Sequence, residues 1–190
     1  MLPQKKQLDL LFVDTETTGL DPLKHELIEV AAIRTSPDGR NVLSIYKAKL
    51  RPTHAGDADP QALKINGYTP EEWTPEKCET PLNVVNQLTT LALDTMLVGH
   101  NVSFDERFLL PLFQHYNFTP PWSYHKIDTV ALAYPLYLAD PRLTKLSLGP
   151  LCEYFGMPAP KHNALADVTA CREVFLELMQ RYTVRCARKA

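Results

Sequence analysis

The feature that most constrains the fold of this chain is a set of four acids and one histidine in three separated segments. The segments are residues 12–20 (FVDTETTGL), 99–105 (GHNVSFD) and 162–167 (HNALAD), and the side chains are those of Asp14, Glu16, Asp105, His162 and Asp167. Acids that converge on one point repel each other unless a cation lies between them. Hard divalent cations take clustered oxygen ligands. The pattern therefore predicts a fold that gathers these segments around a metal ion.

The composition suits a single globular domain over residues 1–190. Of the 190 residues, 45% are hydrophobic and 22% are charged, so the chain can bury a sizeable core and is not expected to be disordered. The N-terminal apolar run, residues 8–13, contains Asp9 and is too short for a signal or membrane segment. We therefore expect a cytoplasmic protein without membrane association.

The hydrophobic pattern predicts five strands. Residues 8–13 read as a buried strand that ends at Asp14, and residues 26–34 and 43–50 flank the turn signal Ser36-Pro37-Asp38-Gly39. These three strands predict an antiparallel meander. Two further strands are expected at residues 96–99 and 125–127.

Helices are expected between and after these strands. Ser103 with Glu106 three residues later matches a capping box, and Asp128 or Thr129 is expected to cap a helix that runs towards Tyr137. The other predicted helices cover residues 61–65, 81–93, 146–155 and 163–182. This order predicts an α/β fold with a mixed five-stranded sheet, an antiparallel meander plus parallel strands, flanked by helices.

Each acidic segment also has a purely structural interpretation. Asp14 and Glu16 share one face of a regular strand, but an isolated D-x-E is about as often a solvent-facing pair at a strand end. Asp105 lies in the first turn of its predicted helix, where the helix dipole alone favours an acid by roughly 0.3–1 kcal/mol. Phe104 can belong to the core or stack on a base. Helix capping explains Asp128 adequately, so it is left out of the metal set.

His162 and Asp167 are five residues apart, which is about 140° around a helix. They converge only if His162 stands on the loop before the helix and Asp167 lies in its first turns. Pro158, Pro160 and a capping Asn163 favour such a loop. A histidine beside a metal ligand suits proton transfer from water, whereas a lone histidine is by default a surface residue.

Together the segments resemble the DEDDh family of 3′→5′ exonucleases, which includes the proofreading subunits of bacterial replicative DNA polymerases. The matches are DTETTGLDP at residues 14–22, H-N-x-x-F-D at residues 100–105 and H-x4-D at residues 162–167. The tyrosine branch of this family would instead carry a tyrosine at the position of Asn163. One departure is Asn66, where the family often has a histidine in a segment that helps to hold the terminal nucleotides.

The resemblance implies a ribonuclease H-like topology for the whole chain and hydrolysis to nucleoside 5′-monophosphates. It implies metal ligands at Asp14, Glu16, Asp105 and Asp167, with His162 as the general base. Ligands that offer only oxygen select Mg²⁺ or Mn²⁺ over zinc, and two ions per site are expected. A histidine base predicts a large loss of activity below roughly pH 6. The expected substrate contacts are Thr17, Ile65, Asn66, Asn101 and Phe104.

The expected partners are single-stranded or frayed 3′ ends of nucleic acid. The net charge of −2 argues against tight binding of a long duplex, because phosphate contacts dominate such affinity. The first of the three segments, residues 12–20, resembles the DNA-proofreading members of the family and favours DNA over RNA as the substrate. One alternative is an exoribonuclease that trims short RNA or tRNA ends. A non-catalytic nucleic-acid-binding module is the less favoured alternative, because the chain has kept every expected metal ligand. No polymerase-attachment tail is expected after the last helix, and polymerase contact and oligomeric state are left open.

Overall fold

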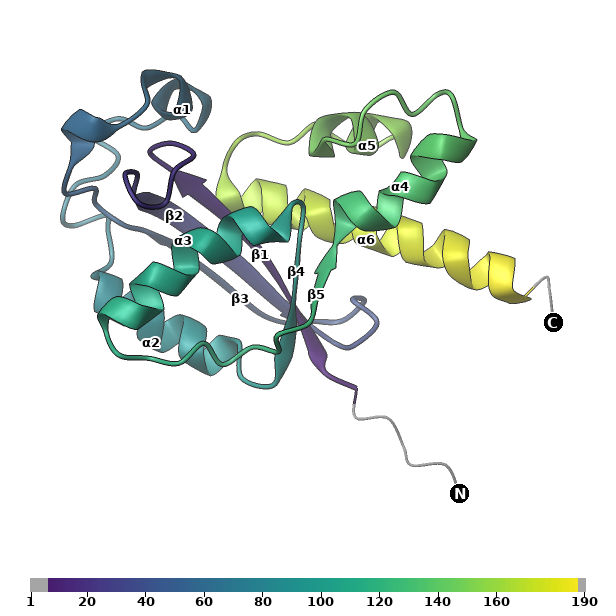
Figure 1. The fold of residues 1–190 in the computed structure, drawn as a ribbon, viewed down its shortest axis with the longest axis horizontal. Helices are drawn as coiled ribbons and strands as arrows, with labels where there is room; N and C mark the ends of the chain where they lie inside the picture. Colours follow the sequence, from purple (N-terminus) through teal and green to yellow (C-terminus); the bar gives the residue numbers. More distant parts are fainter. Residues whose placement is uncertain (1–6, 188–190) are drawn as a thin grey trace.

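The computed structural model describes residues 7–187, with side chains placed up to residue 183. In chain order the elements are β1 (Asp9–Thr17), β2 (Leu27–Thr35), β3 (Val42–Lys49), the 3-10 helix η1 (Ala55–Asp57), α1 (Pro60–Ile65), α2 (Pro81–Leu91), β4 (Thr95–Gly99), α3 (Val102–His115), β5 (Lys126–Asp128), α4 (Thr129–Ala139), α5 (Leu148–Tyr154) and α6 (Ala164–Ala187). Figure 1 shows these helices arranged around one twisted sheet. None of the described helices is long and apolar enough to cross a bilayer.

The strands of this sheet follow the order β3-β2-β1-β4-β5. β1, β2 and β3 form an antiparallel meander, and β4 and β5 add parallel to β1. This confirms the predicted mixed five-stranded sheet. Because β1 and β4 are parallel, with Phe12 opposite Val98, the part of β1 that follows Phe12 lies near the start of α3, which follows β4 directly (Figure 1).

The two faces of the sheet are buried by different helices, and β1 contributes to both. Its side chains alternate, so Leu11 and Val13 pack with α2 and α3, whereas Leu10 and Phe12 pack with α6. The ring of Phe12 meets that of Phe175 edge-on, with centroids 5.3 Å apart. The same alternation places the next even-numbered residues of β1 on the face that α6 covers.

β1 runs further than the sequence predicted, through Glu16 to Thr17. It does so because β2 pairs with it along its whole length, up to the pair Thr17–Leu27, with an irregularity between Glu16 and Thr17. The strand is thus long enough to hold the D-x-E pair in regular geometry. The last helix is also longer than predicted and reaches Ala187.

The predicted capping box at Ser103 is wrong. α3 begins at Val102, and its N-cap is Asn101, which has a left-handed backbone (φ 65°) and no side-chain cap bond. The backbone N–H of Asn101 donates a hydrogen bond to Asp128 Oδ1 at 3.1 Å. Glu106 accepts a hydrogen bond from Trp122 Nε1 at 3.2 Å. α3 therefore starts directly after β4, because a contact from β5 fixes the turn that a local motif was expected to form.

Candidate metal centre

Three carboxylates meet where β1 ends and α6 begins. Asp14 and Glu16 lie on the same side of β1, because residues i and i+2 of a strand point to one face. Asp167 lies in the first turn of α6, which crosses that face. One oxygen from each of these three carboxylates lies within 4.8 Å of the others. The arrangement offers the clustered oxygen ligands that a hard divalent cation takes.

Asp105 stands beside this group on the first turn of α3. Its side chain is 3% exposed, and its Oδ1 accepts a hydrogen bond of 2.8 Å from Thr15 Oγ1. Burial raises the pKa of Asp14 well above its usual range, and the neighbouring charges of Asp105 and Glu16 raise it further. Asp105 is therefore close enough to interact with Asp14, although its carboxylate is held by Thr15.

The electrostatics of the site favour a bound cation. Burial, followed by the charges of Asp167 and Glu29, raises the pKa of Glu16 to about 8. Burial also raises the pKa of Asp105 to about 7 and, despite backbone hydrogen bonds, that of Asp167. Among the described residues, no lysine or arginine forms an ion pair with the four predicted ligands. An all-oxygen set of mutually repelling acids fits the divalent ions that the family uses.

His162 lies on the loop immediately before α6, as predicted. Its backbone is left-handed (φ 52°) and its side chain is exposed. The amide of the preceding Lys161 donates to Asp167 Oδ1 at 2.9 Å, so the loop is tied to one of the predicted ligands. A positive charge on the His162 imidazole would lower the pKa of Asp167.

Asn163 caps α6, as predicted, through a 3.2 Å hydrogen bond from the amide of Ala166 to Asn163 Oδ1. Its Nδ2 donates to Glu29 Oε1 at 3.3 Å. Glu29 is a fifth acid near the site that the sequence analysis missed. The antiparallel pairing of β1 and β2 places Glu29 directly across from Glu16. The register of these two predicted strands was therefore the signal that could have identified Glu29.

Two of the expected substrate contacts have structural partners inside the protein. Asn66 is 9% exposed, donates to the carbonyl of Thr17 at 2.9 Å and accepts from the amide of Tyr68 at 3.1 Å. Thr17 donates to the carbonyl of Gly19 at 2.6 Å. Ile65, at the end of α1, is 49% exposed. These residues shape the turn after β1, and their contact with a nucleotide stays a prediction.

Asn101 and Phe104 lie at the start of α3, next to Asp105. Asn101 is exposed, whereas Phe104 is half-buried against Phe108, with ring centroids 5.1 Å apart. Phe104 therefore belongs partly to the core and keeps some surface for a ligand. Asp128 caps α4 by accepting from the amide of Val130 at 2.9 Å, which confirms its structural role.

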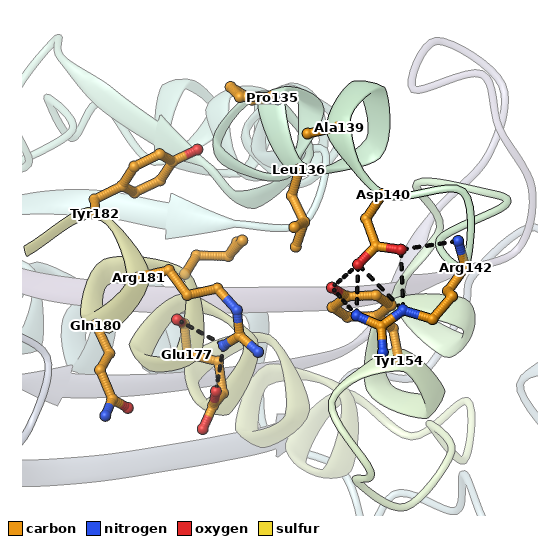
Figure 2. A pocket seen from close by; sticks show the side chains of 11 residues that line it. Pro135, Leu136, Ala139, Asp140, Arg142, Tyr154, Glu177, Gln180, Arg181 and Tyr182 are labelled. Atoms are coloured by element: carbon orange, nitrogen blue, oxygen red, sulfur yellow. Dashed lines mark hydrogen bonds and ion pairs between the residues drawn. The ribbon is translucent and has the colours of Figure 1, made fainter. Parts of the chain in front are cut away.

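A separate cavity lies between α4, α5 and α6 (Figure 2). It has a volume of about 720 Å³, and none of the predicted site residues is among the described residues that line it. Its charged groups are paired. Arg142 bonds to Asp140, which also accepts from the hydroxyl of Tyr154, and Arg181 bonds to Glu177. This cavity offers no cluster of unpaired acids for a metal.

Comparison with known proteins gives one consistent family. The family model RNase_T, described as exonuclease, matches residues 11–175. The PolC-type DNA polymerase III of Thermotoga maritima is 31% identical over 175 residues, which cover 90% of this chain and 12% of that protein. The DNA polymerase III subunit epsilon of Treponema pallidum is 29% identical, over 87% of this chain and 74% of that protein. The chain thus spans about an eighth of the PolC-type relatives that it matches.

Solved structures agree with the sequence relatives. A zinc-bound complex of Escherichia coli exonuclease I with single-stranded DNA superposes with a TM-score of 0.80 at 26% identity, over 93% of this chain and 41% of that one. A complex of the same enzyme with a dT13 oligonucleotide gives 0.81 at 25% identity. The sheet order and the flanking helices therefore match the ribonuclease H-like fold that the sequence predicted. This chain belongs to the DEDDh exonuclease family.

Proposed function

We propose that this chain is a metal-dependent 3′→5′ exonuclease that shortens DNA and releases nucleoside 5′-monophosphates. The observation that carries the proposal is the group of carboxylate oxygens from Asp14, Glu16 and Asp167, all within 4.8 Å of one another. Asp105 stands beside them, and no lysine or arginine among the described residues forms an ion pair with it. Relatives named as DNA polymerase III subunits, and a structural neighbour bound to single-stranded DNA, support DNA as the substrate.

The residues fit two Mg²⁺ or Mn²⁺ ions, which Asp14, Glu16, Asp105 and Asp167 would hold. Such ions would supply Lewis acidity to the attacking water and to the leaving 3′ oxygen. In this proposal Asp105 accepts the hydrogen bond from Thr15 with one carboxylate oxygen and would bind a metal ion with the other. The hydrogen bond from Thr15 thereby orients the side chain in advance.

His162 acts as the general base in this proposal. It takes the proton from the attacking water, which a histidine can do near neutral pH. Its position supports the role, because it is exposed on a loop beside Asp167 and is not a member of the three-acid group. The left-handed backbone and the bond from Lys161 to Asp167 restrict where the imidazole can reach.

The substrate is a short single-stranded or frayed 3′ end. A chain with a net charge of −2 lacks the basic excess that a tight duplex binder uses. Exposed Asn101 and partly exposed Phe104 lie next to Asp105 and can contact the last nucleotides. We propose that residues 1–190 act as one exonuclease domain in the cytoplasm. Association with a polymerase is the corresponding proposal for its partner, given the relatives' names.

The test is to compare 5′-end-labelled single-stranded DNA, duplex DNA and RNA of one sequence with the protein and Mg²⁺. We expect a ladder that shortens from the 3′ end, released mononucleotides and the highest rate on single-stranded DNA. EDTA and the Asp167→Ala variant serve as controls, and both should leave the label at full length. Internal cleavage, or a faster rate on RNA than on DNA, would contradict the proposal.

A further inference from the structure

Glu29 is a buried acid next to the candidate metal centre with no assigned role. It lies on β2, its side chain is 5% exposed, and it pairs across the sheet with Glu16 on one side and Lys49 on the other. It is not among the three acids whose oxygens meet. Burial raises its pKa, whereas the charges of Lys49 and Lys47 lower it. A buried acid in this position needs a hydrogen-bond donor.

Asn163 is that donor, and both ends of its side-chain amide are used. Nδ2 donates to Glu29 Oε1 at 3.3 Å, and Oδ1 accepts from the amide of Ala166 at 3.2 Å. One residue thus joins the second strand of the sheet to the first turn of α6. Because Asn163 directly follows His162, this link fixes the end of the loop that carries the imidazole.

The loop needs such a link because His162 has a left-handed backbone, which is strained for a residue other than glycine. On the other side of His162, the amide of Lys161 donates to Asp167. Asp167 is a proposed metal ligand, so a bound ion would compete with the loop for its oxygens. Glu29 stands outside that group and can hold the loop whether or not metal is bound.

We propose that Glu29 and Asn163 form a positioning pair that holds the His162 loop against the sheet, so that the imidazole faces the attacking water. Neither residue touches the reacting atoms in this proposal, and both act through His162. The inference rests on the proposed role of His162 as general base. It assigns the positioning of that base to two residues, Glu29 on β2 and the N-cap residue Asn163 of α6.

Three variants separate the hydrogen bond from charge and from helix capping. Glu29→Ala removes the acceptor, whereas Glu29→Gln keeps an oxygen that can accept from Asn163. Asn163→Ser keeps a good N-cap for α6 but is too short to reach Glu29. We expect Glu29→Ala and Asn163→Ser each to lower kcat by up to about tenfold, the scale of one hydrogen bond. KM should not change, and any shift in the Mg²⁺ concentration for half-maximal rate should be the same in Glu29→Ala and Glu29→Gln, because both remove one charge near Glu16. The kcat of Glu29→Gln should stay within about twofold of wild type.

The same change in a His162→Ala background tests whether Glu29 acts through the histidine. If it does, Glu29→Ala costs nothing further once the imidazole is gone, because the two effects are coupled. An additional loss in that background would overturn the proposal. Equal losses for Glu29→Gln and Glu29→Ala would also overturn it, since they would show that the charge matters and not the hydrogen bond.

Amide hydrogen exchange in the metal-free protein provides a readout that does not depend on activity. We expect faster exchange at residues 161–163 in Glu29→Ala and Asn163→Ser, and wild-type exchange in Glu29→Gln. Unchanged exchange in all three variants would overturn the positioning pair. A wild-type rate for His162→Ala would instead refute the proposed general base, and the exchange result would still decide whether Glu29 and Asn163 hold the loop.

Discussion

Two groups of acids in this molecule differ in whether the protein supplies them with a cation. In the cavity between α4, α5 and α6, Asp140 accepts from the guanidinium of Arg142 and from the hydroxyl of Tyr154, and these bonds hold its pKa far below the usual range (Figure 2). At the end of β1, Asp14 and Glu16 have acids as neighbours, and their pKa values are raised.

The difference separates a group of acids with a structural role from the group that we propose to be functional. A paired acid is stabilised in the folded chain by its own partners. A cluster of unpaired, partly buried acids costs stability, and it persists where a ligand from outside relieves the repulsion. The cavity between α4, α5 and α6 is lined by the paired charges. Charge balance, and not the presence of a cavity, is the observation that favours the acids at the end of β1 as the proposed site.

The largest expected effect on activity is at the acids near the end of β1 (Asp14, Glu16, Asp105 and Asp167), called here the unpaired group; Asp140 and Glu177 form the paired group. Asp167→Ala removes one of the three oxygens that meet there, and we expect turnover to fall by more than about a thousandfold, since ion-mediated charge stabilisation contributes several kcal/mol. The matched control is Asp140→Ala, which removes an acid of the paired group and should keep the wild-type rate. Single-turnover hydrolysis of labelled single-stranded DNA measures both. Similar rates for the two variants would remove the distinction between the regions.

The next effect is that of His162→Ala, which leaves all four acids in place. We expect turnover to fall by about 10²–10⁴, the usual range for a general base, while Mg²⁺ and DNA still bind. Raising the pH should restore part of the rate, because hydroxide becomes more available when no base is present. A loss of Mg²⁺ affinity, measured by titration calorimetry, would show that His162 is a ligand instead.

The sequence predicted the parts of this site that depend on local geometry. The spacing of Asp14 and Glu16 placed them on one strand face, and five residues between His162 and Asp167 required a loop followed by a helix. Both features are present in the structure. The order of strands and helices was predictable for the same reason, because periodicity within each segment determines it.

The features that the sequence did not predict depend on contacts between distant segments. Ser103 matched a local capping motif, but a hydrogen bond from Asn101 to Asp128, 27 residues away, sets the start of α3. Asn163 was predicted as a cap, yet its bond to Glu29 crosses 134 positions of the chain. Such contacts depend on strand register and on where the helices pack. Local sequence patterns do not show them, because they form only when the whole chain has folded.

A third prediction concerns the stability of the unpaired group without metal. An acid whose pKa is higher in the folded state stabilises the fold below its unfolded pKa, and this contribution is lost as the pH rises through the folded value. With Glu16 at about 8 and Asp105 at about 7, the metal-free protein should become less stable between roughly pH 4 and pH 8. The paired group should show no such decline in this range, because the pKa of Asp140 is lowered.

Mg²⁺ should reverse that decline. At pH 8 and about 100 times Kd, we expect the ion to raise Tm by about 5–10 °C, whereas at pH 5 protons compete and the increase should be much smaller. Calorimetric melts at both pH values, with and without Mg²⁺, measure the difference. The Asp167→Ala variant is the control and should respond weakly to the ion. Equal Mg²⁺ effects at pH 5 and pH 8 would show that the raised pKa values do not govern binding.

The smallest effect is expected at the paired group. Arg142→Met removes the guanidinium from Asp140, but the arginine side chain is 78% exposed, and exposed ion pairs contribute little to stability. We expect Tm to fall by a few degrees at most, and less in high salt, which already screens the pair. The hydroxyl of Tyr154 still donates to Asp140, so the acid keeps one partner. The rate on single-stranded DNA should stay at the wild-type value. A slower rate would mean that the cavity between α4, α5 and α6 takes part in substrate binding, and the contrast between the two acidic groups would then be one of two binding regions.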